Sequence, residues 1–434
     1  MKPQARIQAV IELLEKVYHG RIPMDAVCGD YMRARRYIGS KDRAFIADCV
    51  YDLMRHHARL GWWNAHMKLP DLPRLRVIIY LILVRNFPAS RLKDLFDGSS
   101  YAPEKLKESE LELIKKLEGK TIDTSDMPED ILAECPLKYA RSLKNYFGDG
   151  FKEEMNALIG SAPLDLRVNI YTAKREDIAA SLEKDGVKTE PTPYSPTGLR
   201  CLEKAYLSKT KAFHKGWVEI QDEGSQMIAH VCQAGPGMQV LDYCAGGGGK
   251  TLALAASMRK KGRIVAMDMD SKRLEKGRLR YKKAGLADII EVRPLDDEKH
   301  RKWLRRQKDK FDVVLLDVPC SGTGTWRRNP DMRWKQIGPD LEELKTIQAE
   351  ILERAHKTVK PGGILVYATC SLLPEENEQQ IEAFLKANAE FSIDPPDEFN
   401  GIGSPFMRLT PYRHNTDGFF AARLKKNIEA DKSV

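Results

Sequence analysis

The sequence predicts a multidomain protein with an α-helical N-terminal bundle, a small α+β connector and a C-terminal α/β domain built on a doubly wound, Rossmann-like sheet. The first observation is length, since 434 residues are roughly three times a typical domain. The second is apolar residues at helical spacing in the first third of the chain, and the third is strand–helix alternation from Gly237 onward. We therefore expect domains at residues 1–145, 146–235 and 236–428.

The chain carries an excess of positive charge. Lys and Arg number 71 and Asp and Glu number 62, which gives a formal net charge of +9. Each local cluster of basic residues is by itself typical of a solvated helix face, but together the clusters favour a nucleic-acid partner. They lie at residues 33–36, 259–261, 272–283, 300–306 and 327–328.

Cysteine usage and hydropathy indicate a cytoplasmic protein. The eight cysteines include no C-x-x-C pair, so neither a zinc site nor a disulfide framework is expected. The longest apolar run, Val77–Val84, is too short to cross a bilayer, and the N-terminus lacks the apolar core of a signal peptide. We expect a monomer without a metal or a membrane association. Buried positions are expected for Cys28, Cys49, Cys135, Cys201 and Cys232.

The first domain is predicted to consist of helices joined by short loops. Residues Arg6–Tyr18 carry apolar side chains at helical spacing, and the pattern ends at Gly20. A second long helix is predicted from Lys41 to Trp63, and a buried one at Leu75–Leu83. This region contains no glycine-rich phosphate loop and no paired catalytic carboxylates, so by itself it is a scaffold with a basic surface.

The connector opens near Ser161 with a strand-like run, PLDLRVNIY, and continues with a helix at Arg175–Lys184. Arg167 and Asn169 alternate with apolar neighbours, as exposed strand positions do. These two residues are expected either to touch a substrate or to form the solvent face of the strand.

The third domain alternates strands with helices. The predicted strands are QVLDYC, RIVAMD, DIIEVR, FDVVLLD, ILVYAT and DGFFAARL, with helical periodicity in most of the intervening segments. Such alternation implies a parallel sheet with right-handed crossovers. Open sheets of this kind build their sites at the carboxyl ends of the strands.

A glycine cluster, Gly246–Gly249, follows the first of these strands and opens a helix. Glycines there let the backbone approach a ligand, and the helix N-terminus offers unpaired N–H groups. Cys244 stands where a phosphate loop requires glycine, so the pattern favours a nucleoside-binding loop, with tight strand–helix packing as the alternative. Asp268 ends the second strand, where a carboxylate accepts hydrogen bonds from ribose hydroxyls. These features fit NAD enzymes and S-adenosylmethionine enzymes equally well.

Two cysteines stand at predicted strand ends, Cys320 shortly after Asp317 and Cys370 directly after ILVYAT. Hydride transfer has no use for two thiols, whereas methylation at a pyrimidine carbon does, because that carbon is a poor nucleophile. A thiolate must add to the neighbouring ring carbon, and a base must later remove the remaining ring proton. An acid near the ring nitrogen stabilises the adduct. One acid and two thiols match these tasks; otherwise both cysteines are compact, buried residues.

Several motifs of this half resemble those of a known family. LDYCAGGGGKT, VAMD, LLDVPCSGTGTWRRNPDMRW, YATCSLLPEENE and DGFFAARL are similar, in that order, to motifs of the Nop/Sun (RsmB-like) RNA cytosine-5 methyltransferases. The resemblance covers residues 237–425 and, more loosely, PLDLRVN and QDEGSQ. SKDRAFIADCVYDLMR resembles the NusB-type RNA-binding domain of the bacterial members. The resemblance implies a class I methyltransferase domain that uses S-adenosylmethionine to methylate carbon 5 of a cytosine in RNA, with ribosomal RNA favoured.

Carried over to this sequence, the resemblance implies four catalytic roles. Cys370 is the nucleophile, and Cys320 assists the release of product. Asp317 contacts the cytosine ring and lies near the methyl donor, while Lys250 reaches the catalytic pocket.

The resemblance also implies a cofactor site. Asp268 holds the ribose, and the acid near the adenine falls at Asp296. Asp297 competes for that role, because Leu295 replaces the glycine usual before the acid. Gly247 replaces a proline of the family's loop, which should make the loop more flexible. The implied loop is Cys244, Ala245, Gly246, Gly247, Gly248, Gly249 and Lys250, with Asp317 beside the methyl donor.

Several alternatives stay open. The substrate can be transfer RNA, or the chain can be a non-catalytic RNA-binding or ribosome-assembly factor with a methyltransferase fold. Amino-group methylation is a further alternative, although DVPCSG departs from the Pro-Pro motif of such enzymes. Beyond Cys320, Trp326 with Arg327 and Arg328 is expected to stack a base and grip phosphates, or else to be a plain surface loop. In either RNA the target cytosine must be unpaired or flipped out.

Overall fold

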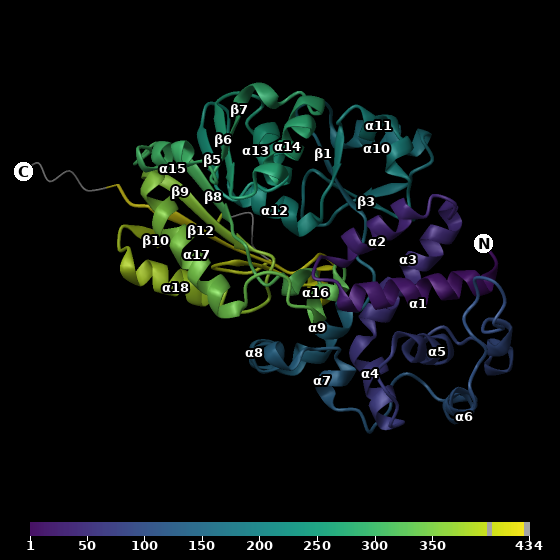
Figure 1. Ribbon diagram of the computed structural model, residues 1–434. Helices are drawn as coiled ribbons and strands as arrows, with labels where there is room; N and C mark the ends of the chain where they lie inside the picture. The colour runs from purple at the N-terminus through teal and green to yellow at the C-terminus, as the bar shows by residue number, and fades with distance from the viewer. Residues whose placement is uncertain (397–401, 429–434) are drawn as a thin grey trace, which may run out of the picture. The chain divides into compact units, whose positions relative to one another are not determined.

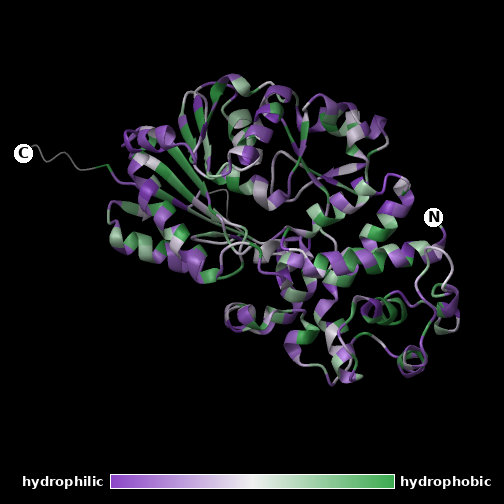
Figure 2. Cartoon of the chain, viewed as in Figure 1, coloured by the Kyte–Doolittle hydropathy of each residue, from purple (hydrophilic) through white to green (hydrophobic). Residues whose placement is uncertain are grey.

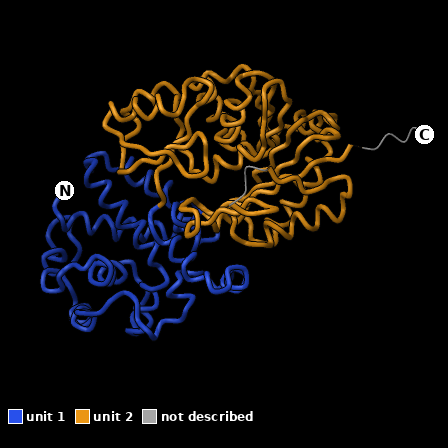
Figure 3. The backbone as a smooth tube through the Cα atoms, turned by 180° about the vertical axis from the view of Figure 1, so that it is seen from behind, with its two compact units in different colours: residues 1–161, 325–338 blue, residues 162–324, 339–434 orange. Residues whose placement is uncertain are grey.

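The computed structural model describes residues 1–396 and 402–428. The chain forms two compact units, shown in different colours in Figure 3. Residues 1–161 and 325–338 make up the N-terminal unit, and residues 162–324 and 339–434 make up the C-terminal unit. The segment 325–338 therefore belongs to the N-terminal unit, although it follows the predicted fourth strand of the C-terminal half in sequence.

The N-terminal unit is helical, as predicted (Figure 1). Its core is a single cluster of apolar side chains, to which every residue of the buried helix α5 from Leu75 to Leu83 except Arg76 contributes. Figure 2 shows this helix in the green of hydrophobic residues. The helices are α1 (Pro3–His19), α2 (Met24–Ala34), α3 (Ser40–Arg55), α4 (His57–His66), α5 (Pro73–Leu83), η1 (Ala89–Asp94), α6 (Glu108–Leu117), α7 (Glu129–Leu132), α8 (Leu137–Phe147), η2 (Gly148–Gly150), α9 (Phe151–Ala157) and α16 (Pro330–Trp334).

The predicted helix from Lys41 to Trp63 is in fact two helices, and the prediction of one continuous helix is wrong. The break lies at His56, between α3 and α4. Glu134 explains the break, because its fully buried carboxylate accepts hydrogen bonds from the N–H groups of Ala58 (2.7 Å) and Arg59 (3.0 Å). These N–H groups lie in the first turn of α4. The Glu134 side chain, which is distant in sequence, therefore caps the N-terminus of a second helix.

The segment 325–338 is firmly packed within the N-terminal unit. The Asp331 carboxylate accepts a hydrogen bond of 2.8 Å from the N–H of Met24. The Trp334 ring stacks on His57, with ring centroids 4.8 Å apart. The Lys335 ammonium donates to the carbonyl of Val17 at 2.9 Å.

The same packing overturns the expectation that Trp326, Arg327 and Arg328 form an open RNA-gripping loop. Trp326 is only 1% exposed, lies near the Tyr139 ring, and has the Arg333 guanidinium above its own ring at 4.6 Å. Arg327 is also buried. A base cannot stack on a tryptophan ring that other side chains already cover. The aromatic and basic residues of this segment therefore contribute to internal packing.

The C-terminal unit contains a small antiparallel sheet of order β2-β3-β1-β4. Helix α10 packs against this sheet, and the two together enclose an apolar core that is separate from that of the larger sheet. The elements are β1 (Asp165–Val168), α10 (Arg175–Lys184), β2 (Thr189–Pro191), β3 (Gly198–Cys201), η3 (Leu207–Lys209), α11 (Lys211–His214) and β4 (Val218–Ile220).

The larger sheet of this unit has eight strands in the order β10-β12-β9-β8-β5-β6-β7, with β11 paired to β12. The five strands from β9 to β7 are parallel, as predicted, whereas β12 pairs with β9 in antiparallel register. The strands are β5 (Gln239–Asp242), β6 (Arg263–Asp268), β7 (Ile290–Pro294), β8 (Phe311–Asp317), β9 (Val359–Thr369), β10 (Phe391–Ile393), β11 (Met407–Leu409) and β12 (Phe419–Lys426).

Helices cover both faces of this sheet, which confirms the doubly wound α/β prediction (Figure 1). Val313 and Leu315 of β8 pack with α12 and α13, whereas Val314 and Leu316 pack with α15, α17 and α18. Alternate side chains of a buried strand point to opposite faces, which is why the strand is apolar throughout. The helices are α12 (Glu223–Val231), α13 (Gly249–Ser257), α14 (Ser271–Lys283), η4 (Ala287–Ile289), α15 (Glu298–Arg305), η5 (Thr323–Thr325), α17 (Leu341–Ala355), η6 (His356–Thr358), α18 (Glu378–Ala387) and α19 (Pro411–His414).

Across the described parts of both units, no helix has the length and apolar character needed to span a bilayer.

Candidate active site

The strand order brings the predicted site residues to one edge of the large sheet. Neighbouring strands β9, β8, β5, β6 and β7 run parallel, so their carboxyl ends meet there. In the register of β8 and β9, Asp317 lies opposite Ala368. Cys320 and Cys370 follow these two positions directly and are therefore delivered to the same place.

The glycine loop between β5 and α13 makes a tight turn into the helix. Gly246 and Gly248 have φ angles of +54° and +79°, in the left-handed region that favours glycine. A Cβ atom at Gly248 would lie 2.2 Å from the Tyr281 hydroxyl oxygen, so a side chain is excluded there by space as well as by backbone. Gly248 is also the N-cap of α13, whose first N–H groups point out of the helix end.

Two arginines hold the carbonyl oxygens of this loop. Arg167 donates to the carbonyl of Gly249 at 2.5 Å, and Arg280 of α14 donates to the carbonyl of Gly247 at 2.5 Å. The Glu219 carboxylate of β4 fixes Arg280 through contacts of 2.7 and 3.1 Å. Gly247 was expected to loosen the loop, and these contacts restrain its carbonyl from outside.

Arg167 and Asn169 are buried, so the expectation of a solvent face is wrong. Burial lowers the pKa of Arg167 to about 10. Asn169 donates to the carbonyl of Ala284 at 3.0 Å, which ties β1 to the end of α14. Sequence alternation suggested exposure because it does not reveal that the rest of the unit covers this face of the small sheet.

Asp268 lies at the end of β6 and is fixed by the main chain. One carboxylate oxygen accepts from the N–H of Gly246 at 2.8 Å, and the other accepts from the N–H of Asp270 at 2.8 Å. At the end of β7, Asp296 and Asp297 are both exposed. Asp297 is the N-cap of α15, and its carboxylate accepts from the N–H of Lys299 at 2.8 Å.

Lys250 and Asp317 form an ion pair of 2.6 Å across the ends of α13 and β8. Burial favours the neutral amine, but the adjacent Asp317 carboxylate outweighs it and raises the pKa of Lys250. Cys244 lies next to this pair in the loop after β5. Burial, followed by the charges of Asp268 and Asp317, raises the pKa of Cys244 well above its usual value and keeps that thiol protonated.

Asp242, at the end of β5, is a site residue that sequence reasoning missed. Its side chain is fully buried, and it accepts a hydrogen bond of 2.6 Å from the Thr251 hydroxyl. Burial raises the pKa of this carboxyl to about 7. A perturbed carboxyl beside the glycine loop is a common mark of a functional site. The sequence did offer one signal for Asp242: it is the last residue of the predicted strand QVLD, close before the glycine loop.

The two predicted thiols meet. The sulfur atoms of Cys320 and Cys370 are 3.4 Å apart, and neither cysteine is in a disulfide. The hydrogen bond to Cys370 and burial raise the pKa of Cys320 well above its usual value, with smaller contributions from the charges of Cys370 and Glu376. Five of the other six cysteines are buried, as expected: Cys28, Cys49, Cys135, Cys201 and Cys232.

The two thiols have different charged neighbours. The Lys250 ammonium interacts electrostatically with Cys370, whereas the Glu376 carboxylate interacts with Cys320. A nearby cation stabilises a thiolate, and a nearby anion disfavours one. The positive charge thus lies on the side of Cys370, and the negative charge lies on the side of Cys320.

A buried carboxylate lies behind both thiols. Glu376 is fully buried and accepts a hydrogen bond from the N–H of Ser321 at 2.8 Å. It also accepts from the hydroxyl groups of Ser321 and Ser371 and from the side-chain amide of Gln348. The sequence placed Glu376 within the motif YATCSLLPEENE but indicated no role for it, because most of its hydrogen-bond partners are distant in the chain.

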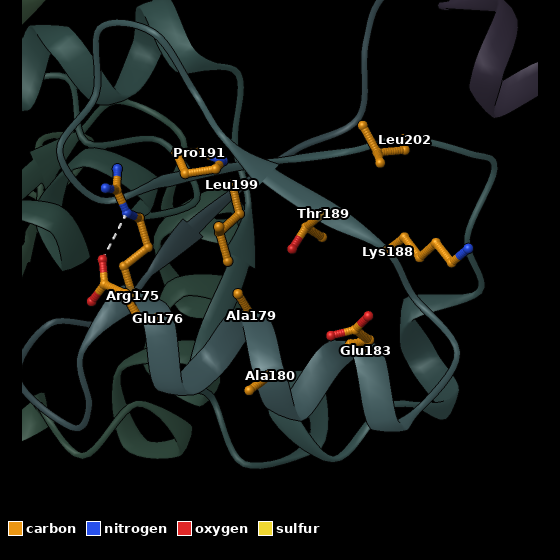
Figure 4. A pocket seen from close by; sticks show the side chains of 10 residues that line it. All are labelled: Arg175, Glu176, Ala179, Ala180, Glu183, Lys188, Thr189, Pro191, Leu199 and Leu202. Carbon is orange, nitrogen blue, oxygen red and sulfur yellow. Dashed lines mark hydrogen bonds and ion pairs between the residues drawn. The ribbon is translucent and has the colours of Figure 1, made fainter.

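Two hollows lie elsewhere in the C-terminal unit. A cavity of about 770 Å³ has Met269, Leu295 and Arg301 in its lining, next to the residues that end β6 and β7. A second, of about 460 Å³, lies between α10 and the small sheet; Figure 4 shows Ala179 and Glu183 from the helix facing Thr189 from the strand. Neither lining includes the paired cysteines. Within residues 1–396 and 402–428, no group of three His, Cys, Asp or Glu residues is placed to hold a metal ion.

Comparison with protein families gives two matches. Residues 230–425 match the family model of the 16S rRNA methyltransferases RsmB/F. Residues 136–207 match the model of the ferredoxin-like domain of RsmF/B-like methyltransferases. The two matches contain the paired cysteines, the glycine loop and most of the small sheet, and they confirm the resemblance noted from the motifs.

Individual proteins give the same result over most of the chain. The chain is 28% identical to ribosomal RNA small subunit methyltransferase B of Photorhabdus laumondii, over 91% of this chain and 93% of that protein. Among solved structures, PH0851 superposes with a TM-score of 0.75 at 26% identity, covering 98% of this chain and 99% of that one. NSun6 from Pyrococcus horikoshii, at 24% identity, covers 68% of this chain and 99% of its own, with a TM-score of 0.59, and so shares the fold.

Proposed function

Since this chain belongs to the RsmB/F family of S-adenosylmethionine-dependent RNA methyltransferases, we propose that it transfers a methyl group to carbon 5 of a cytosine in ribosomal RNA. One observation carries the proposal: two thiols 3.4 Å apart at adjacent strand ends, beside the Lys250–Asp317 pair. The RNA class comes from the relatives' names. The cysteine chemistry is supported by the geometry of this chain.

The residues present fit S-adenosylmethionine, which supplies the methyl group when bound. The glycine loop turns through the left-handed region at Gly246 and Gly248, and it leads into the N-terminus of α13. We assign the loop Cys244–Lys250 to the cofactor, and Asp268 to its ribose. Asp296 is assigned to the adenine side, because Asp297 already caps α15.

We assign the attack to Cys370. As a thiolate, Cys370 adds to carbon 6 of the cytosine ring, and the electron pair of the double bond moves to carbon 5, which can then take the methyl group. Asp317 and Lys250 lie where they can hold the ring and its developing charge, since their 2.6 Å contact sits at the end of β8. The Lys250 ammonium interacts electrostatically with Cys370, which places a positive charge beside the proposed nucleophile.

We assign the second half of the reaction to Cys320. The hydrogen bond to Cys370 is the first cause that holds the Cys320 thiol protonated in the free enzyme. Once Cys370 has become a neutral thioether, its contribution to the raised pKa of Cys320 is removed, and Cys320 ionises more readily than in the free enzyme. The Cys320 thiolate then takes the remaining proton from carbon 5, the bond between Cys370 and carbon 6 breaks, and Cys370 leaves with the electron pair.

The parts of the chain follow from this assignment. We propose a helical RNA-binding domain over residues 1–145, a connector over 146–235 and a catalytic domain over 236–428. The target cytosine must be unpaired or flipped out to reach two buried strand ends. We further propose a monomer in the cytoplasm, where free thiols persist.

A methyl-transfer assay tests the proposal. Purified protein with radiolabelled S-adenosylmethionine is expected to label small-subunit ribosomal RNA, and bisulfite sequencing is expected to find 5-methylcytosine in it. Label in transfer RNA alone would favour the transfer-RNA alternative, and label in neither RNA would favour a non-catalytic assembly factor. Label on amino groups would contradict the cysteine chemistry.

A further inference from the structure

The two cysteine loops share an anchor. Each thiol is followed by a serine, and both serines hydrogen-bond to the same residue, Glu376. The Ser321 N–H and hydroxyl donate at 2.8 and 2.5 Å, and the Ser371 hydroxyl donates to the second of these carboxylate oxygens. Ser321 and Ser371 thus both donate to one carboxylate, Ser321 through two groups and Ser371 through one.

The partners of Glu376 are suited to a carboxylate. The N–H of Ser321 and the amide of Gln348 can only donate to it, and both serine hydroxyls are placed to do the same. Gln348 also donates to the carbonyl of Pro319 at 3.0 Å, so α17 joins the same network. The side chain of Glu376 is fully buried, and these hydrogen bonds offset the cost of removing it from water.

Direct contacts join the loops as well. The N–H of Gly324 donates to the carbonyl of Cys370 at 2.9 Å, and the N–H of Leu372 donates to the Thr323 hydroxyl at 2.8 Å. The Ser371 hydroxyl also lies 3.2 Å from the hydroxyls of both Ser321 and Thr323. Without Glu376, direct contacts of this kind would have to fix two loops that come from different strands. The spacing of the thiols depends on both loops at once.

We propose that Glu376 is the positioning residue of the reaction: it holds the Cys320 and Cys370 loops together so that the two thiols act in turn on one ring. The inference rests on the proposed function. Glu376 is fully buried and acts through Ser321 and Ser371. A displacement of about 1 Å in a reacting group can lower a rate by about 100-fold, so the effect of losing this anchor is expected to be large.

The first test compares Glu376→Gln with Glu382→Gln, a change at an exposed position on α18. Glutamine keeps the shape but turns one acceptor into a donor that faces other donors. Turnover of Glu376→Gln is expected to fall about 100-fold, with binding of S-adenosylmethionine unchanged in calorimetry. Glu382→Gln is expected to retain the wild-type rate. Equal rates for the two variants would overturn the proposal.

The second test uses the serines and separates the two loops, and it remains informative if Glu376→Gln folds poorly. Ser371→Ala releases the nucleophile's loop, so RNA–protein adduct is expected to form slowly. Ser321→Ala removes the hydroxyl contact of the other loop and leaves its N–H contact, so adduct is expected to form normally and to be resolved more slowly on denaturing gels. Adduct kinetics like those of wild type in both variants, or the reverse pattern, would overturn the proposal.

Thiol alkylation tests whether Glu376 positions the two thiols or only stabilises the fold. Loss of the Glu376 charge is expected to shift the alkylation of Cys320 by iodoacetamide to lower pH, and Glu382→Gln is expected to leave it in place. An unchanged profile together with a lowered melting temperature would reduce Glu376 to a structural residue. Failure of the proposed function would look different, since the unaltered protein would then leave ribosomal RNA without 5-methylcytosine, whereas methylation by Cys370→Ala would contradict only the choice of nucleophile.

Discussion

The two sides of the proposed active site are held by different means. On the cofactor side, residues 244–250 and Asp268, the contacts are mainly to the backbone: arginines hold loop carbonyls, and Asp268 accepts main-chain N–H groups. On the cysteine side, residues 317–324 and 369–376, side chains converge on one buried carboxylate. A nucleoside site needs a fixed backbone, whereas two thiols that act in turn need fixed side chains.

This difference predicts which function each substitution removes. Changes on the cysteine side should stop chemistry and leave cofactor binding intact. Changes on the cofactor side should weaken binding of S-adenosylmethionine and leave the thiols as they are.

The largest effect is expected from Cys370→Ala. Loss of the attacking thiol should lower methyl transfer by a factor of at least about 1,000, because the cytosine carbon is then not activated. A radiolabelled transfer assay measures the rate, and calorimetry is expected to give the wild-type affinity for S-adenosylmethionine. If Cys370→Ala lost both methyl transfer and affinity for S-adenosylmethionine, the cysteine side and the cofactor side would not be independent.

Cys320→Ala should come next, with turnover lowered by about 100- to 1,000-fold. The distinctive result is expected on a denaturing gel, where protein covalently joined to RNA should accumulate because the adduct is not resolved. Cys232→Ala, a change at a buried cysteine outside the pair, is the matched control and should show no such band. Adduct in the control, or none in Cys320→Ala with active RNA, would contradict the assignment.

On the cofactor side, Asp268→Ala should weaken binding of S-adenosylmethionine by about 10- to 100-fold, the usual worth of hydrogen bonds to a carboxylate. Calorimetry measures the affinity. Alkylation of Cys320 and Cys370 by iodoacetamide should follow the wild-type pH profile, since Asp268 is bonded to the glycine loop and to Asp270. A changed profile would mean that the two sides are coupled.

The smallest effect is expected from Arg280→Ala, which removes one charge-assisted hydrogen bond to the Gly247 carbonyl. A loss of about 1.5 kcal/mol corresponds to roughly 10-fold weaker binding of S-adenosylmethionine. Arg278→Ala, at an exposed position on the same helix, is the control and should bind normally. If both variants bind like wild type, the arginine contact does not support the loop.

The strands, the glycine loop and both cysteines could be predicted because their signals are local. An apolar run of strand length followed by Asp317 and Cys320 specifies a buried strand with its chemistry at the carboxyl end. The resemblance to a known family then separated the roles of the two thiols.

Other features depended on contacts between distant parts of the chain. Glu376 lies 55 residues from Ser321, and Asp331 lies 307 residues from Met24, so no sequence window contains both partners. Arg167 and Trp326 were misjudged for the same reason, because a charged strand position and an aromatic, basic loop usually face solvent. Only tertiary packing shows that these side chains are buried.

The assignment of the attacking thiol is tested most directly by mapping a trapped adduct in the unaltered enzyme. RNA that carries 5-fluorocytidine at the target position cannot lose a proton from carbon 5, so the adduct should persist with both cysteines present. Proteolysis and mass spectrometry then locate the nucleotide on the chain. The nucleotide is expected to be attached to Cys370. Attachment to Cys320 would contradict the assignment of the attacking thiol.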